Sequence, residues 1–247
     1  MLPYFWSDGS AIPQSLYTAN FSPAHIAWVL TVLLLMPAIV CIYRLRTAAV
    51  RVRIKKGLAL VMLLCEASSW LWQALTGAFT VQYSLPLQLC DISVFLEFAA
   101  VYAKRAALLR EFSYALSMPA AFAAVVTPGW YYPFLTYGYL KMALMHALLI
   151  LIPVLLVWGD GVRPDYRRLL QVSPLFVLFI AIAVTANTFL GSNYMFLAYV
   201  PRDTALAVFE SWFGNPGYVL PELFLLLLIW TVLYLPWTAP EHRARSG

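Results

Sequence analysis

A mostly apolar stretch, SLPLQLCDISVFLEF from Ser84 to Phe98, carries four side chains that could do chemistry: Gln88, Cys90, Asp91 and Glu97. A thiol becomes a nucleophile when a nearby base takes its proton. At helical spacing, Cys90 and Glu97 share one face of a helix. Gln88 and Asp91 are three residues apart and share another face. The stretch therefore predicts a thiol with amide and carboxyl groups around it.

Polar residues in other apolar segments could complete such a site. Glu66 and Gln73 fall on one helical stripe with Trp70. His146 and Lys141 are two further ionisable residues in apolar segments, where such groups often mark a functional site. We expect these stripes to point into one cavity, whose candidate polar residues are Glu66, Gln73, Gln88, Asp91, Glu97, Asn187 and Asn193.

Each of these residues also has a structural interpretation. A cysteine in an apolar helix is commonly a small hydrophobic residue, and this is our interpretation of Cys41 and Cys65. A single histidine in a helix is more often a packing residue than a base. Lys141 could simply extend to the membrane surface. Asp91 and Glu97 could be protonated or bonded to neighbouring helices.

The composition indicates that lipid surrounds these segments. Hydrophobic residues make up 63% of the 247 residues and charged residues 11%, whereas a soluble domain has about 25% charged residues. The first residues, MLPYFWSDGS, lack the basic start and the cleavage site of a signal peptide. We therefore predict an all-α, polytopic transmembrane helix bundle that forms one integral membrane domain over residues 1–247.

Seven segments approach the roughly 20 apolar residues that span a bilayer. The fourth is short and contains Pro119, which a membrane helix tolerates when neighbouring helices satisfy the freed carbonyl group. The predicted spans are residues 25–43, 57–79, 85–103, 111–126, 134–158, 169–190 and 218–237.

The basic residues predict the orientation of these spans. All but two of the 16 Lys and Arg residues fall in the first, third and fifth connections or in the C-terminal tail, the exceptions being Lys141 and Arg202. Cytoplasmic loops carry the Lys/Arg excess, so the N-terminus is expected outside and the C-terminus inside, across the cell membrane. This distribution also argues against nucleic acid as the reason for the net charge of +5. In this orientation Cys90, Gln73 and Asn187 lie in the outer half of the bundle.

The sequence offers little support for a metal or a cofactor. The histidines are His25, His146 and His242, and none has the spacing of a ligand pair. No glycine-rich phosphate loop or nucleophile elbow is present. The last predicted span has no lysine that could form a retinal Schiff base. We expect no metal and no cofactor.

The long sixth connection contains DTALAVFESWFG, from Asp203 to Gly214. Asp203 is a candidate N-cap, and the apolar residues after it fall on one side of a helix. We predict an interfacial helix over residues 204–213, which could cover a lipid entrance or simply anchor the connection.

Four stretches in the same order resemble the YwaF-like family of bacterial integral membrane proteins: SLPLQLCDIS, KMALMHALLILIPV, GSNYMFLAYVP and FGNPGYVLPEL. The resemblance covers most of the chain. One departure is that the family often has a histidine where this sequence has Gln88.

That family is distantly similar to animal membrane acyltransferases that remodel ether phospholipids, and more remotely to androgen-induced lipid hydrolases. The resemblance implies Cys90 as nucleophile, His146 as base and a membrane lipid, phospholipid or lysophospholipid, as partner. On the predicted boundaries the two residues differ in depth by roughly 9 Å, and Gln73, Gln88 or Asn193 could donate to the oxyanion. The alternative is a non-enzymatic binding or sensing protein, or a proton-coupled small-solute transporter, which the carboxyl groups favour.

Overall fold

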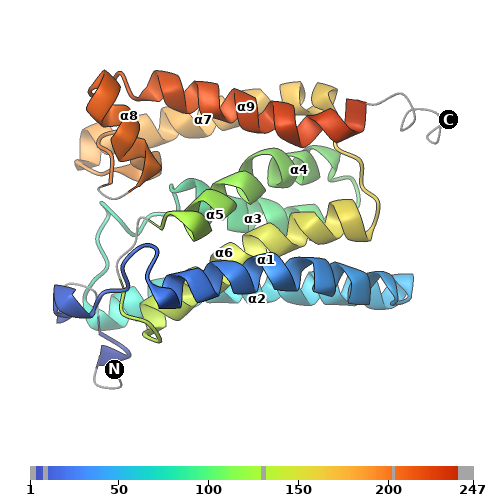
Figure 1. The fold of residues 1–247 in the computed structure, drawn as a ribbon, viewed down its shortest axis with the longest axis horizontal. Helices are drawn as coiled ribbons and strands as arrows, with labels where there is room; N and C mark the ends of the chain where they lie inside the picture. Colours follow the sequence, from blue (N-terminus) through green and yellow to red (C-terminus); the bar gives the residue numbers. More distant parts are fainter. Residues whose placement is uncertain (1–3, 8–10, 129–131, 202–203, 239–247) are drawn as a thin grey trace.

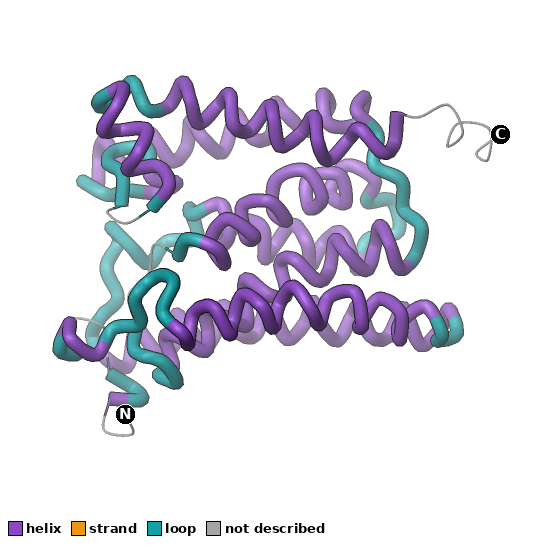
Figure 2. Tube along the Cα trace, viewed as in Figure 1, coloured by secondary structure: helices purple, strands orange, loops and turns teal. Residues whose placement is uncertain are grey.

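The computed structural model describes residues 4–7, 11–128, 132–201 and 204–238, and all regular secondary structure in these ranges is helical (Figures 1 and 2). Arg202, Asp203, His242, Arg243 and Arg245, which some predictions involve, lie outside the described residues. The α-helices are α1 (Pro23–Arg44), α2 (Ala48–Thr76), α3 (Leu89–Tyr102), α4 (Ala107–Phe112), α5 (Met118–Val126), α6 (Tyr137–Val154), α7 (Tyr166–Leu190), α8 (Ala205–Phe213) and α9 (Val219–Thr238). The other helical turns are the π-helical η4 (Ser113–Ser117) and η5 (Leu155–Gly159) and the 3₁₀ turns η3 (Gln14–Leu16) and η6 (Tyr194–Phe196).

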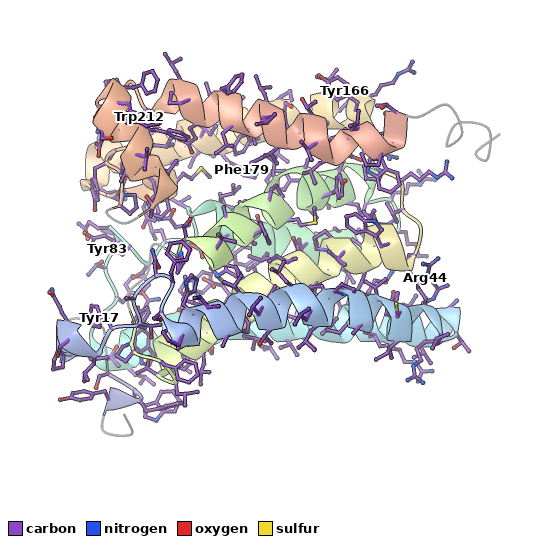
Figure 3. All side chains as sticks on the ribbon, viewed as in Figure 1. Tyr17, Arg44, Tyr83, Tyr166, Phe179 and Trp212 are labelled. Atoms are coloured by element: carbon purple, nitrogen blue, oxygen red, sulfur yellow. The ribbon has the colours of Figure 1, made fainter. Side chains whose placement is uncertain are left out.

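The long helices lie along one axis and run in alternating directions (Figure 1). α1 and α2 form one side, α3 to α6 the middle, and α7 and α9 the other side, with α8 near the start of α9. We call the end at which α1, α3, α6 and α9 begin the amino end, and the opposite end the carboxyl end. Loops gather at both ends (Figure 2). Figure 3 labels Tyr17, Tyr83 and Trp212 at the amino end and Arg44 and Tyr166 at the carboxyl end.

The predicted all-α bundle is confirmed. Five helices of the described chain are long and apolar enough to cross a membrane: α1, α2, α6 with η5, α7 and α9. The other two predicted spans correspond to α3 and to the run from α4 through η4 to α5. α3 has 14 residues, which is about 21 Å of helix against a hydrocarbon core of about 30 Å. The run from α4 to α5 carries Arg110 and Glu111, which lower its apolar character.

The boundaries of α2 correct the predicted second span. α2 begins at Ala48 instead of Gly57, so the basic residues from Arg51 to Lys56 lie on a helix and not in a connection. Their long side chains are good helix formers and can reach the polar surface from a helical backbone. At the other end α2 stops at Thr76, because Gly77 has a φ of 74° and closes the helix in the left-handed conformation.

The start of α3 is a second correction. The third predicted span begins at residue 85, but α3 begins at Leu89 with Gln88 at the N-cap position. The Ser84 hydroxyl donates to Gln73 Oε1 at 2.5 Å and accepts the backbone N–H of Thr80. The serine is therefore used to hold the connection between α2 and α3, and Cys90 lies in the first turn of α3.

α6 is the central helix of the bundle. In the most apolar 18-residue stretch of α6 and η5, 67% is buried inside the bundle, whereas in the corresponding stretch of α9 only 6% is buried. α1, α7 and α9 expose many large apolar side chains, including Leu34, Val177 and Phe224. Exposed apolar surface of this extent suits lipid and not water, so the chain is a multi-pass membrane protein by its helix composition.

Candidate functional site

An ion pair between α2 and α6 lies inside the bundle. Lys141 Nζ is 2.9 Å from Glu66 Oε2, and the two side chains are 9% and 4% exposed. The suggestion that Lys141 extends to the membrane surface is therefore wrong, because its ammonium group finds a carboxylate on the neighbouring helix. A charge buried in an apolar bundle is costly unless it is paired in this way.

The first turn of α3 brings Cys90 and Asp91 to this pair. Asp91 interacts electrostatically with Glu66 and Lys141. The half-buried Cys90 thiol is within electrostatic reach of Asp91, Lys141, Glu66 and, further along α3, Glu97. Three helices thus bring three of the predicted polar residues, together with a lysine, within electrostatic reach of the Cys90 thiol.

A second thiol lies beside this cluster and provides a useful contrast. Cys65 is on α2 next to Glu66, and its thiol donates to the Lys141 carbonyl oxygen at 3.8 Å. Cys65 is half-buried, whereas Cys41 on α1 is exposed. Cys65 therefore shares the surroundings of Cys90 without being in the first turn of a helix.

His146 is buried in α6, with a single helical turn separating it from Met142. Its Nδ1 lies 2.8 Å from the Met142 carbonyl oxygen. Because a carbonyl oxygen only accepts, Nδ1 carries the proton of the neutral ring and Nε2 is the acceptor. In this tautomer Nε2 is the ring nitrogen that can accept a proton.

The structure does not join His146 directly to Cys90. His146 is three residues after Ala143 and seven after Tyr139, so it shares their face of α6, whereas Lys141 lies on a different face. Among the described residues, no hydrogen bond links the Cys90 thiol with the His146 ring. The pair stays a prediction.

Glu97 is on the same face of α3 as Cys90, deeper in the bundle. Its side chain is fully buried (0% exposed) and lies against Ser117 of η4. Within the described residues no N–H group, and no hydroxyl hydrogen that is not already used elsewhere, is donated to either of its carboxyl oxygens. Glu66, in contrast, is ion-paired with the Lys141 ammonium group.

The predicted residue Asn187 holds the connection after α7. Its Oδ1 accepts the backbone N–H of Tyr194 at 2.7 Å and the Ser192 hydroxyl at 2.8 Å. Its Nδ2 donates to the Tyr194 carbonyl at 3.0 Å. The Tyr194 hydroxyl donates to the Val81 carbonyl at 2.7 Å. Burial raises the pKa of this hydroxyl, so it remains a donor.

Asn193 and Gln88 hold the same connection from other directions. Asn193 Oδ1 accepts the backbone N–H groups of Ala198 and Tyr199, and its Nδ2 donates to the Tyr199 carbonyl at 2.7 Å. Gln88 Oε1 accepts the backbone N–H of Met195 at 2.7 Å, and its Nε2 donates to the Asn193 carbonyl at 3.3 Å. These amides belong to a group that stabilises the amino end rather than to the cluster around Cys90.

Gln73 is also used in holding the chain together. Its Nε2 donates to the Ser69 hydroxyl at 3.2 Å while its Oε1 accepts from Ser84. Each primary amide has two N–H donors, and the structure uses one on Gln73, Gln88 and Asn193 alike. An oxyanion role for any of them would fall to the second N–H group.

His25, the other histidine considered as a metal ligand, has both ring nitrogens engaged. Nδ1 accepts the backbone N–H of Phe21 at 2.8 Å, and Nε2 donates to the Val125 carbonyl at 2.9 Å. His25 thereby ties the start of α1 to the end of α5. Over the described chain, no three His, Cys, Asp or Glu side chains come close enough to hold a metal ion.

Sequence reasoning missed several polar residues with structural or chemical roles. Lys141 was considered alone, although a lysine inside an apolar span is itself a signal that a carboxylate lies opposite. Tyr194 is fully buried and central to the amino end. The Ser93–Ser117 contact and the ion pairs of Glu111 and Asp160 join residues far apart in the sequence, and no local pattern indicates such pairings.

Comparison with known proteins identifies one family. The model of the TMEM164 family matches residues 20–234, which is most of the chain. No curated protein and no solved structure matches. The match supports the expectation that most of the chain resembles one membrane protein family, and that family is TMEM164. The YwaF-like assignment stays a prediction.

Proposed function

The chain belongs to the TMEM164 family, and from this premise we propose that it is an integral membrane enzyme that transfers or hydrolyses acyl chains of membrane lipids. Cys90 is the nucleophile and His146 the base. One observation supports the proposal: the Glu66–Lys141 ion pair between α2 and α6 and Asp91 of α3 are within electrostatic reach of the Cys90 thiol. A buried ionic cluster is costly to build in an apolar bundle, so intramembrane groups of this kind commonly mark a functional site.

The proposed reaction has two steps. His146 Nε2 takes the Cys90 proton, the thiolate attacks the ester carbonyl of a phospholipid, and the His146 proton goes to the leaving alcohol. The resulting thioester is then cleaved by the hydroxyl group of a lysophospholipid, which is transfer, or by water, which is hydrolysis. The first turn of α3 assists because the positive end of a helix dipole stabilises negative charge on a residue there. The reaction requires Nε2 to reach the thiol directly or through one water molecule, and such contacts often tighten only with substrate bound.

The orientation belongs to the same proposal. We infer seven crossings, with α3 and the run from α4 to α5 completing the five long helices, in a bacterial plasma membrane. The Lys/Arg residues near the carboxyl end support a cytoplasmic position for that end, which places Cys90 toward the outer leaflet.

Topology reporters test this orientation. A reporter inserted after Arg46 or Arg105 should read cytoplasmic, and one after Thr80 should read external. A cytoplasmic signal at Thr80 would move the Cys90 site to the inner leaflet and contradict the assignment.

Substitution of the two related cysteines tests the activity. Cell lipids are compared by mass spectrometry with and without the protein, and the purified protein is assayed on the lipids that change. Cys90→Ala should reduce turnover by several orders of magnitude, while Cys65→Ala should leave it within a few-fold. Equal activity of both variants would remove the thiol from the mechanism.

A second candidate function is proton-coupled transport of a small solute, or binding of it. The observation that favours it is the number of carboxyl groups inside the bundle, which are Glu66, Asp91 and Glu97. A carrier of this kind should tolerate Cys90→Ala. Retained solute uptake by that variant, without lipid turnover in the wild type, would favour this candidate.

A further inference from the structure

Glu97 stands apart from the other strongly buried carboxyl groups of the bundle. Among the described residues the other two, Glu66 and Glu111, are ion-paired with Lys141 and with Arg168, respectively. Glu97 is fully buried and, over the described residues, takes part in none of the ion pairs. An ionised carboxylate without a cation or hydrogen bonds would cost several kcal/mol in such surroundings, so something positive must accompany it.

The directions of two hydrogen bonds show where that positive group lies. The Ser93 hydroxyl donates to the Leu89 carbonyl at 2.7 Å, and a carbonyl oxygen can only accept. Ser93 has one hydroxyl hydrogen, so in the 2.8 Å contact between the two serines Ser117 is the donor. The hydrogen of Ser117 is thereby committed, and Ser117 presents only lone pairs to Glu97.

We propose that Glu97 is a proton-binding site inside the bundle, whose proton is donated to Ser117 and orders the chain of bonds Glu97–Ser117–Ser93–Leu89. Loss of the proton leaves a carboxylate that accepts. The Ser117 hydroxyl then turns from Ser93 to Glu97, and the Ser117–Ser93 bond between η4 and α3 breaks. The ligand of the site is a proton, and its release changes the contact between two packed helices.

Within the part of the chain that the structure describes, the charged groups nearest to α3 are engaged with other partners and do not take the place of this proton. Glu66, Lys141, Glu111 and Arg168 are engaged in their own ion pairs, and Arg110 Nε donates to the Ala100 carbonyl at 3.2 Å. α5 has no titratable residue. The other titratable groups on α6 and η4 are His146, bonded to the Met142 carbonyl, Tyr137, bonded to Ser68, Tyr139, and Tyr114, bonded to the Leu233 carbonyl. On α2 they are Cys65, bonded to the Lys141 carbonyl, and the basic residues within 51–56 near the carboxyl end; on α3 they are Tyr102, bonded to the Lys56 carbonyl, Asp91 near Lys141, and Cys90, which is within electrostatic reach of Glu97.

The backbone at Ser117 is suited to a contact that can switch. Residues 113–117 form a π-helical turn between α4 and α5, and such turns interrupt the regular bonding of a helix and are frequent at functional sites. The contact lies on the helix that carries Cys90 in its first turn, and Ser93 is bonded to the residue before that cysteine. Proton binding at Glu97 is therefore linked to the part of α3 that carries the candidate site, whichever reaction occurs there.

Infrared spectroscopy of the full chain in lipid nanodiscs tests the assignment. An ordinary glutamic acid, with a pKa of about 4.3, is ionised at neutral pH and shows no carboxylic acid C=O band. The difference spectrum of wild type minus Glu97→Gln at neutral pH should contain such a band, displaced in D₂O. Glutamine should preserve the fold because its amide can donate to Ser117 as the protonated acid does. Glu111→Gln, at an ion-paired carboxylate, is the matched control and should leave the band in place.

A second variant keeps the test decisive if Glu97→Gln alters the fold. Ser117→Ala removes the acceptor, so the band should move in wavenumber and remain. Three results would overturn the proposal: the wild type lacks the band, the band persists in Glu97→Gln, or its position is unchanged in Ser117→Ala. A band that is present in choline chloride but lost in sodium chloride would also overturn the proposal, because a bound sodium ion would then occupy the position of the proton.

Discussion

The two ends of the bundle are held together by different chemistry. At the carboxyl end charged groups join the helices. Glu111 on α4 pairs with Arg168 on α7 at 3.0 Å, accepts the Asp165 backbone N–H at 3.1 Å and accepts the Tyr234 hydroxyl of α9. Asp160 next to η5 likewise pairs with Arg51 and Lys55 of α2 and accepts the Tyr43 hydroxyl of α1. One carboxylate at each place connects three elements.

At the amino end neutral amides have the same role. Asn187, Asn193 and Gln88 use both the oxygen and the nitrogen of their amide groups to hold the connection after α7. An amide can satisfy backbone donors and acceptors at once without a counterion. A carboxylate accepts more strongly but needs a cation or several donors when buried.

This difference between the two ends indicates how polar residues in an apolar chain should be interpreted. Asn187, Asn193 and Gln88 are polar and buried or half-buried, yet their polar atoms are used by the fold itself. Glu97 is buried without such partners, and Cys90 lies beside a charged cluster to which two other helices, α2 and α6, contribute. The unpaired group, and not the polar residue as such, is therefore the better indicator of a site in this molecule.

The largest effect is expected at the carboxyl end. Arg168→Ala leaves Glu111 buried without its cation, and removing one partner of a buried pair costs about 3–5 kcal/mol. Because the Arg168 side chain is 30% exposed, the free energy of unfolding should fall by about 2–3 kcal/mol. It can be measured by denaturant titration in detergent micelles.

A double variant is the control for this prediction. Arg168→Ala combined with Glu111→Gln removes the uncompensated charge, so it should be more stable than Arg168→Ala alone. An Arg168→Ala protein as stable as the wild type would show that the ion pair does not hold α7 to α4.

A smaller loss is expected at the amino end. Asn187→Ala removes three hydrogen bonds and leaves the buried Tyr194 backbone N–H without its partner, which costs about 1–3 kcal/mol. The same titration measures it. Thr188→Ala next to it is the matched control, because the Thr188 hydroxyl is exposed and bonds only the Val184 carbonyl; it should stay within about 0.5 kcal/mol. A loss larger than that of Arg168→Ala would reverse the comparison of the two ends.

The smallest effect is expected for Gln88→Ala. Gln88 is half-buried, and water can replace part of its bonding to Asn193 and Met195. The loss of stability should be about 0.5–1.5 kcal/mol. Lipid turnover should change little if Gln88 is structural. A large loss of turnover in a variant of nearly normal stability would instead return Gln88 to the reaction as an oxyanion donor.

Much of the fold follows from hydropathy, and the failures have local causes. α1, α7, α8 and α9 lie within a few residues of their predicted ranges, because long apolar runs with clear ends leave few alternatives. The start of α2 was placed too late because its basic residues were interpreted as a loop. α3 was started too early because Ser84 and Pro86 have the composition of a helix start, although the serine bonds Gln73.

The site was less accessible to sequence reasoning, since it depends on pairs of distant residues. Cys90, Asp91 and Glu66 could be selected as polar residues in apolar spans, but the partner of Glu66 is 75 positions away on α6. Ser93 and Ser117 have no chemical signal of their own, and only the packing of η4 on α3 brings them together. The separation of the amides from the thiol cluster likewise depends on how the connection after α7 folds.

The central claim is that Cys90 becomes acylated, and trapping the thioester tests it most directly. The purified protein is incubated with a phospholipid substrate, quenched in acid and analysed by peptide mass spectrometry. The account predicts one acyl group on the peptide with Cys90, released by hydroxylamine, formed more slowly in His146→Ala and absent in Cys90→Ala. An acyl group on Cys65 or Cys41, or turnover of lipid without any acylated peptide, would contradict the account.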